Sequence, residues 1–133
     1  MFEKGFTLGK NNPFYWEYNQ DTGIKIIRQF KNNEREDIFS NENIEKIIDY
    51  VKKSGRVRLS NNVARLTNGT EIDGLGKFVF NEIQKDTSYA QSMSQFVAIM
   101  VKLGIFEYNG ARKSFEFWVV NEHWYEVLLS ERI

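Results

Sequence analysis

The strongest structural signals in the chain lie in residues 88–120, SYAQSMSQFVAIMVKLGIFEYNGARKSFEFWVV. Ser88 and Gln91 have the spacing of a capping box, in which two side chains satisfy free backbone N–H groups at a helix start. Apolar residues then recur at steps of three and four, as on one face of a helix. They are Met93, Phe96, Val97, Met100 and Leu103. Gly104 follows, where a helix favours a left-handed residue. The stretch predicts an amphipathic helix over residues 88–103 with an exposed hydrophilic face.

A β-hairpin is predicted directly after this helix. Residues 105–108 and 114–120 are apolar and rich in aromatic side chains. Between them, Asn109-Gly110 is a dipeptide typical of tight hairpin turns. The chain therefore runs from an amphipathic helix into a hairpin whose tip carries Arg112 and Lys113.

The N-terminal part of the chain predicts a second hairpin. Residues 14–18 and 24–30 are β-prone runs, and the short loop between them contains Gly23. Residues 1–13 are rich in Gly and Asn and predict an arm or loop. The charged block 31–37 predicts a connector, and it is the best candidate for a domain boundary.

Two helices and two short strands are predicted between the hairpins. The first helix is expected to begin at the N-cap Ser40 and to end at Gly55, because apolar residues between them recur at helical spacing. Alternating polar and apolar residues predict a strand over 56–59, and 63–67 is a further candidate strand. Asp73 is the expected cap of a second helix. Its apolar side consists of Leu75, Phe78, Val79 and Ile83.

Taken in order, residues 40–120 predict helix, strand, helix, turn, helix, strand, wing and strand, an order that resembles the winged-helix superfamily. Many members of that superfamily bind DNA, and others are pure protein-interaction modules. The resemblance implies an α+β fold, namely a winged helix-turn-helix core with an N-terminal β-hairpin and a short C-terminal helix. We expect residues 1–37 to form the N-terminal arm and hairpin, and residues 38–133 the winged-helix domain, together as one compact unit.

The composition excludes several classes of protein. The 133 residues contain no cysteine, which excludes disulfides and thiolate metal sites. No run of about 18 apolar residues occurs, so no segment is expected to span a membrane. The N-terminus lacks an apolar run preceded by positive charge, so no secretory signal is expected. These features predict a cytoplasmic protein.

Catalytic, metal and cofactor sites are not expected. His123 is the only histidine, and no set of nucleophile, base and orienting group can be assigned from the spacings. Gly74-Leu75-Gly76-Lys77 is similar to part of a phosphate loop, but its spacing differs from that of the nucleotide-binding motif. Phe78 also stands where a hydroxyl would hold magnesium. An enzyme is therefore the least favoured of the hypotheses for this chain.

The winged-helix resemblance implies that the N-terminal end of the 88–103 helix enters the major groove, while the wing approaches the backbone. The candidates for base contact in this sequence are Tyr89, Ser92 and Gln95. Arg112 and Lys113 at the wing tip are the candidates for phosphate contact. The opposing interpretation is that an exposed helix face is polar in any protein and that hairpin tips are commonly charged.

A second basic region lies between residues 46 and 65, where six Lys or Arg residues occur with one acid, Asp49. If Arg56 and Arg58 lie on a strand, their side chains point to one side. They would then add to a phosphate-binding patch. The alternative is a solvated face that is balanced by acidic neighbours upstream.

Two hypotheses of function follow. The net charge is zero, which argues against coating nucleic acid by bulk charge but leaves room for a local basic face. The first hypothesis is a non-enzymatic protein that binds duplex DNA, as a transcriptional regulator or mobile-element accessory. The second is an interaction module that binds another protein through an aromatic strand face or through the C-terminal helix. Dimerisation through flanking elements, which the resemblance implies, predicts a homodimer.

The two surfaces on which the second hypothesis depends are visible in the sequence. On a strand, Phe14, Trp16 and Tyr18 share one face, which either binds a partner or covers the core. Asn121 is the expected cap of the C-terminal helix. Its shared apolar face consists of Trp124, Val127 and Leu128. Such a helix packs either on its own domain or on a second copy.

Overall fold

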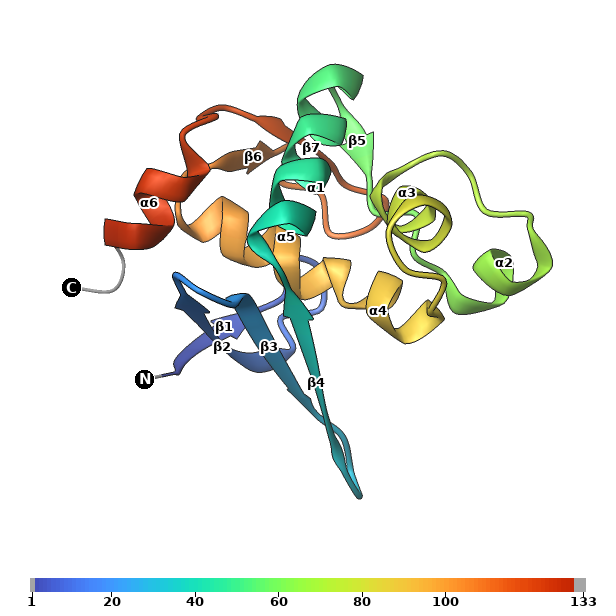
Figure 1. The fold of residues 1–133 in the computed structure, drawn as a ribbon. Coiled ribbons are helices and arrows are strands. Elements are labelled where there is room, and N and C mark those ends of the chain that lie inside the picture. The colour runs from blue at the N-terminus through green and yellow to red at the C-terminus, as the bar shows by residue number, and fades with distance from the viewer. Residues whose placement is uncertain (1, 131–133) are drawn as a thin grey trace.

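The computed structural model describes residues 2–130 as a mixed α+β fold with two antiparallel sheets (Figure 1), which confirms the expected class. The N-terminal sheet pairs its strands in chain order, β1 (Glu3–Phe6), β2 (Pro13–Asn19), β3 (Gly23–Gln29) and β4 (Glu34–Phe39). The second sheet pairs in the order β5–β7–β6 and consists of β5 (Val57–Arg58), β6 (Phe106–Tyr108) and β7 (Glu116–Val119). The helices are α1 (Asn41–Ser54), α2 (Val63–Asn68), α3 (Leu75–Glu82), α4 (Thr87–Gln91), α5 (Met93–Lys102) and α6 (Trp124–Ser130). Within residues 2–130, no helix is long and apolar enough to cross a membrane.

The N-terminal sheet is larger than the predicted hairpin. The β2–β3 hairpin is confirmed, but the predicted arm contains β1 and the predicted connector contains most of β4. The charges of β4 were misleading because one of them faces the core. Asp37 and Phe39 are buried, whereas Ile38 on the opposite face is exposed. Asp37 pairs with Arg28 and with Arg35, each at 3.0 Å, so its buried carboxylate is compensated.

Helix α1 begins and ends as predicted. The Ser40 hydroxyl accepts the backbone N–H of Asn43 at 3.1 Å, as an N-cap does. At the other end, the N–H of Gly55 donates to the carbonyl of Val51 at 3.1 Å. The strand that follows is confirmed, although it is shorter than predicted. The buried stripe of α1 consists of Ile44, Ile47, Ile48 and Val51.

The segment between β5 and α3 differs from its prediction. Residues 63–67 were expected to form a strand, but they belong to helix α2. Asn62 caps this helix by accepting the N–H of Arg65 at 3.0 Å. The cap satisfies a backbone N–H that has no partner within the helix, and it therefore favours a helix over a strand here. Asp73 does not cap α3. Gly74 occupies the N-cap position without a side-chain hydrogen bond.

The glycines at the start of α3 allow close packing against another part of the backbone. A Cβ atom added to Gly74 would lie 2.6 Å from the carbonyl oxygen of Arg58. One added to Gly76 would lie 2.5 Å from the carbonyl oxygen of Ser60. Glycine lowers the intrinsic stability of a helix. Here, however, the absence of a Cβ atom lets the start of α3 pack closely against the chain that follows β5.

The predicted helix over 88–103 is divided into α4 and α5. Ser92, at the junction, is buried, and its hydroxyl donates to the carbonyl of Tyr89 at 2.5 Å. The predicted cap is also wrong, because Asp86 accepts the N–H groups of Ser88 and Tyr89 at 2.9 and 3.2 Å. The Ser88 hydroxyl instead accepts a hydrogen bond from Arg28 at 3.0 Å, so the side chain that was expected to cap the helix ties it to β3.

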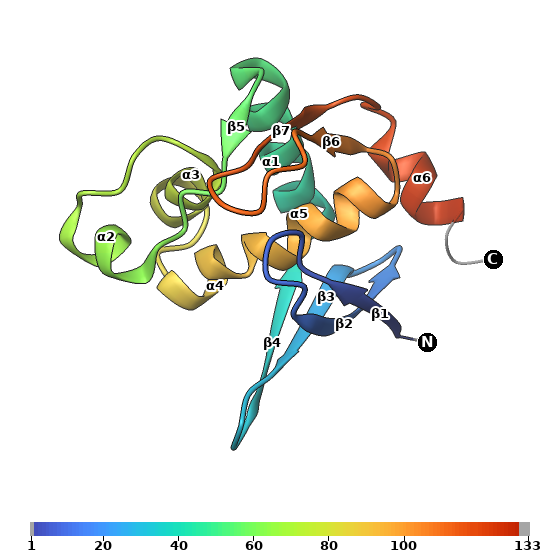
Figure 2. The same ribbon diagram turned by 180° about the vertical axis from the view of Figure 1, so that it is seen from behind.

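Helix α5 is buried on more faces than its predicted stripe. Of the five stripe residues, the four within α5 are buried as expected, but Ala98 and Ile99 are buried as well. Lys102 is the one exposed residue of the helix. The N-terminal sheet lies on one side of α5 and β6 on another (Figures 1 and 2). The ring of Phe39 on β4 packs at a tilt against the ring of Phe96, with the ring centroids 5.5 Å apart. The expectation that the hydrophilic face of this helix is free is therefore wrong.

The N-terminal sheet and the helices share one hydrophobic core. The inward face of β2 carries Phe14, Trp16 and Tyr18, which are all buried, as the core interpretation of that strand predicted. The proposed boundary at residue 37 falls inside β4.

The second hairpin is present, with a longer loop than Asn109-Gly110 alone would form. Residues 109–115 connect β6 to β7, and we call them the β6–β7 loop. The Asn109 side chain accepts the N–H groups of Ala111 and Glu116 at 3.2 and 3.3 Å, while Phe115 is buried. These contacts order the loop without a two-residue turn.

The C-terminal helix packs on its own chain. Asn121 accepts the N–H of His123 at 2.9 Å just before α6 begins. The indole N–H of Trp124 donates to Glu45 of α1 at 2.7 Å. Trp124 and Leu128 are buried, which agrees with the predicted apolar face.

Replacing Phe96 by alanine should reduce the free energy of unfolding by about 3–5 kcal/mol, because the fully buried ring leaves a cavity that the core cannot close. Chemical denaturation of the wild type and the variant measures the difference. Lys102→Ala on the exposed end of α5 is the control, with an expected change within about 0.5 kcal/mol. A loss below about 1 kcal/mol for Phe96→Ala would contradict the placement of α5.

Replacing Asp86 by alanine should cost about 0.5–2 kcal/mol at pH 7, the usual value of an N-cap. Burial acts to raise the pKa of Asp86, but the N–H of Tyr89 and the Arg35 guanidinium outweigh it, so the pKa is below its ordinary 3.8. A lowered carboxyl pKa stabilises the fold above the unfolded pKa, and that contribution is lost as pH falls through the folded value. Denaturation at pH 7 and near pH 2 should show the difference between variant and wild type shrinking in acid.

Asp73→Ala is the matched control, since this aspartate also precedes a helix but its side chain is exposed and caps nothing. Its expected cost is a few tenths of a kcal/mol at most. Equal costs for the two substitutions would contradict the assignment of Asp86 as the cap.

Candidate functional site

A broad cleft of about 1180 Å³ separates the N-terminal sheet from the second half of the chain. One wall comes from the β1–β2 loop and the end of β3, and the other comes from residues 58–65 and the β6–β7 loop. The junction of α4 and α5 also lines it. Figure 2 shows the β1–β2 loop, in dark blue, beside the red-orange β6–β7 loop.

The lining of this cleft is strongly positive. It contains Lys4, Lys10, Arg28, Arg58, Arg65, Arg112 and Lys113. Among the described lining residues the only acid is Glu71. Because the whole chain has 18 basic and 18 acidic residues, the remainder of the protein carries an excess of acids. The neutral total therefore hides a marked asymmetry, and we call this region the basic cleft.

The cations that line the basic cleft are not equally free. Lys4, Lys10, Arg112 and Lys113 are exposed and form no ion pair with any other residue in the range 2–130. Arg58 and Arg65 lie 3.9 and 4.0 Å from the nearest glutamate oxygens. Both guanidinium groups are exposed and the contacts are long, so these pairs leave the arginines accessible to a ligand. Most of the positive field therefore comes from Lys4 on β1, Lys10 in the β1–β2 loop and the two cations of the β6–β7 loop.

Arg28 is the exception among these cations. Its guanidinium is buried, donates to Asp37 at 3.0 Å and to the Ser88 carbonyl at 2.9 Å, and holds the sheet to α4. Burial lowers the pKa of Arg28, while the Asp37 carboxylate acts to raise it. We assign this residue a structural role at the edge of the cleft.

Hydrogen bonds and a close backbone approach position the two loops, which carry three of the four free cations. The β1–β2 loop is closed by a bond from the Thr7 N–H to the Asn12 carbonyl at 3.0 Å and one from the Asn12 N–H to the Thr7 hydroxyl at 2.9 Å. Gly9 lies so near the β6–β7 loop that an added Cβ would be 2.5 Å from the Arg112 carbonyl oxygen. Lys10 and Arg112 are therefore held on neighbouring loops.

Neutral amide side chains line the part of the cleft nearest the helices. Asn61 donates to the carbonyl of Gln91 and to the hydroxyl of Ser94, both at 3.0 Å, and so joins the 58–65 wall to the junction of α4 and α5. Gln95 also lines the cleft, and its buried Oε1 atom accepts no hydrogen bond from the described residues. This part of the lining therefore adds no negative charge to the cleft.

The structure brings together four of the predicted contact residues. Gln95, Arg58, Arg112 and Lys113 all line the basic cleft. Arg56 lies outside it, with its guanidinium 4.4 Å from the ring centre of Trp118. Arg56 and Arg58 do point to the same side of β5, since each approaches Glu116 at 3.9 Å.

Two of the residues predicted to contact bases, Tyr89 and Ser92, were expected to be exposed, and this expectation is wrong. Tyr89 and Ser92 are 3% and 0% exposed. The Tyr89 ring packs 4.6 Å from that of Phe39, and burial raises the pKa of its phenol to about 12. These side chains face inward because the N-terminal sheet covers α4 and α5, which the order of elements does not reveal.

The α1 lysines of the basic run belong to a paired surface. Lys46 lies 3.4 Å from Glu42, and Lys53 lies 3.0 Å from Asp49. Of the six cations between residues 46 and 65, two line the cleft, namely Arg58 and Arg65. Sequence analysis missed Lys4 and Lys10, which fall in the supposed arm and carry no motif.

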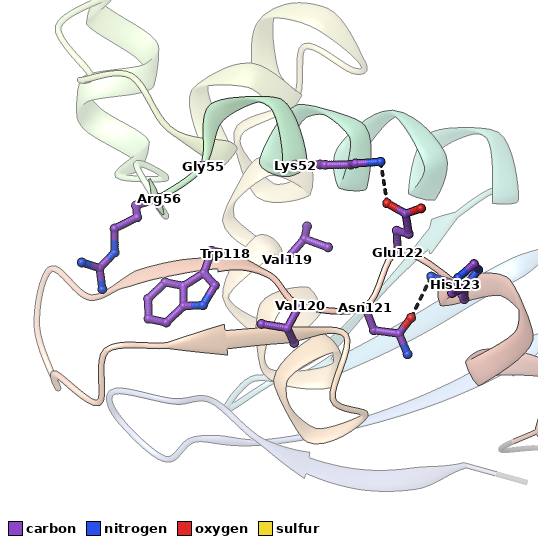
Figure 3. A pocket seen from close by; sticks show the side chains of 9 residues that line it. All are labelled: Lys52, Gly55, Arg56, Trp118, Val119, Val120, Asn121, Glu122 and His123. Atoms are coloured by element: carbon purple, nitrogen blue, oxygen red, sulfur yellow. Dashed lines mark hydrogen bonds and ion pairs between the residues drawn. The ribbon is translucent and has the colours of Figure 1, made fainter.

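A smaller hollow of about 510 Å³ lies between the end of α1 and the chain after β7 (Figure 3). Its charged groups already have partners. Lys52 pairs with Glu122 at 2.6 Å, and Arg56 lies over Trp118. His123 is exposed at its rim. This hollow is therefore a weaker candidate than the basic cleft.

Comparisons of the chain with family models, curated proteins and solved structures gave no match.

Proposed function

We propose that the protein is a non-enzymatic DNA-binding protein whose basic cleft holds the phosphate backbone. The observation that carries this proposal is the concentration of seven cations against one acid in the described lining, on a chain of zero net charge. Phosphate contacts by Lys and Arg supply most of the affinity of such proteins. Four of these cations have no competing carboxylate among the described residues, so they keep their charge for a ligand.

We further propose that residues 41–119 form a winged-helix-like unit in which the wing, and not the helix, contacts DNA. The order of α1, β5, α3, α4–α5, β6 and β7, and the β5–β7–β6 pairing, support this proposal. In that unit α5 would be the recognition helix, but the N-terminal sheet covers it. The proposal therefore assigns DNA contact to the β6–β7 loop and Arg58, whereas Gln95, on α5, lines the cleft beside them. A role as a regulator or mobile-element accessory is the setting that the resemblance favours.

The alternative of a protein-interaction module has less support from the surface. The aromatic face of β2 is buried, and Trp124 of α6 is bonded to Glu45 of the same chain. Both surfaces expected to bind a partner are therefore occupied within the chain. The basic cleft, in contrast, is open and highly charged.

Replacing Arg112 and Lys113 together by alanine should weaken DNA binding about tenfold or more at low salt and make it less salt-dependent. Each lost phosphate contact reduces the slope of log K against log salt by about 0.9 on a duplex and about 0.7 on a single strand. Fluorescence anisotropy with labelled 20-nucleotide single strands and 20-base-pair duplexes, at several salt concentrations, measures both quantities.

The matched control is the double substitution of Lys46 and Lys53 by alanine, which removes the same charge from the paired, exposed face of α1. This variant should bind nearly as the wild type does. Equal loss in both variants would indicate bulk electrostatics. The absence of any binding at low salt would refute the proposal.

A further inference from the structure

The β3–β4 hairpin presents an exposed aromatic ring at the edge of the basic cleft. Phe30 follows the last residue of β3, and its N–H donates to the carbonyl of Asn33 at 2.7 Å across the turn. The side chain is 52% exposed and lines the cleft. Figure 1 shows this hairpin projecting from the body of the protein.

Phe30 is more exposed than any aromatic residue of β2, where Tyr15 is half-buried and also lines the cleft. Phe14 and Trp16 face inward and are at most 2% exposed. An isolated exposed apolar side chain is ordinary in itself. Phe30, however, stands in a cleft lined by cations, and the Arg28 guanidinium lies 5.7 Å from its ring centre. Arg28 itself is buried and bonded to Asp37, so the phosphate contacts would come from the exposed cations of the cleft. A positively charged groove with an aromatic side chain on which a base can stack is the combination that single-strand-binding proteins use.

The burial of α5 argues against a duplex as the preferred ligand. In the winged-helix mode of duplex reading, the recognition helix lies in the major groove and its N-terminal residues contact the base edges. Only Lys102 of α5 is exposed, and the predicted base contacts Tyr89 and Ser92 are buried. In a duplex the faces of the bases are stacked on one another, so Phe30 could not reach one without unstacking. In a single strand those faces are free.

Resting on the proposed function, we propose that the basic cleft takes single-stranded DNA, with a base stacked on Phe30. The phosphates lie along the cations of the β1–β2 and β6–β7 loops. Exposed amide groups of the lining, such as those of Gln29 and Gln91, meet the polar edges of the bases. Stacking tolerates any base, because every base has a π-face, so the cleft binds with little sequence preference.

The chain offers a matched pair of substitutions for the test. Phe30 and Phe6 are both exposed phenylalanines of the N-terminal sheet, each near a cation, at 5.7 Å from Arg28 and 5.5 Å from Lys4. Phe30 lines the cleft, and Phe6 does not. Because both rings are exposed, F30A and F6A should fold, and equal melting temperatures verify this.

The affinities of wild type, F30A, F6A and F30W for a labelled single strand of 20 thymidines and for a 20-base-pair duplex should be measured by anisotropy. F30A should bind the single strand about 5- to 100-fold more weakly, which is the usual effect of removing one stacking residue. Its salt slope should be unchanged, since no phosphate contact is lost. F6A should bind as the wild type does, and F30W should retain or improve the affinity.

Two results would overturn this inference while leaving the proposed function intact. One is wild-type affinity of F30A for the single strand when the Arg112 and Lys113 double variant is weakened. The other is tighter binding of the duplex, without any effect of F30A. Failure of every strand to bind at low salt would instead remove the proposed function itself.

Discussion

Helix α5 needs cover on more than one face, and the rest of the structure is arranged to provide it. Val97, Ala98, Ile99 and Met100 are consecutive buried residues, and consecutive positions on a helix point in different directions. A helix that is apolar around its circumference is stable only inside the protein. The three-stranded sheet covers one side, so a second layer is required. The N-terminal sheet supplies that layer, with Phe39 against Phe96.

A network of charges fastens the N-terminal sheet to the helical part. Arg28 and Arg35 converge on Asp37, and Arg35 continues to Asp86 at 3.1 Å, where Asp86 caps α4. Arg28 also donates to Ser88. A buried ion pair contributes little net stability, but removal of one partner leaves a costly uncompensated charge. The network therefore favours one orientation of the β3–β4 hairpin, and this hairpin carries Phe30.

The same arrangement changes which part of the molecule can bind a ligand. By covering α5, the N-terminal sheet removes the helix that would read a major groove. By placing the β1–β2 loop beside the β6–β7 loop, it brings Lys4 and Lys10 into the same cleft as Arg112 and Lys113. The packing of the N-terminal sheet on α5 thus has two results: it covers the helix, and it forms the charged surface. A chain without net charge acquires a basic region because the acids lie elsewhere.

Local patterns in the sequence determined much of the secondary structure of this protein. The Ser40 cap, the stripe of α1, the β2–β3 hairpin, the burial of Phe96 and the second hairpin all depend on neighbours in the chain, and all are present. Among the segments that were misread, two were decided by side chains outside the pattern. Asn62 caps a helix where a strand was expected, and charged β4 enters the sheet because Arg28 and Arg35 neutralise Asp37.

The tertiary structure alone decided the candidate site. Of the predicted contacts, Gln95, Arg58, Arg112 and Lys113 line the cleft, whereas Tyr89 and Ser92 are buried. Helical periodicity shows which face of a helix is apolar, but it does not show whether a distant segment covers the opposite face. Lys4 and Lys113 are more than a hundred residues apart in the chain, and no local signal relates them. They line the same cleft because the core required the N-terminal sheet to pack across α5.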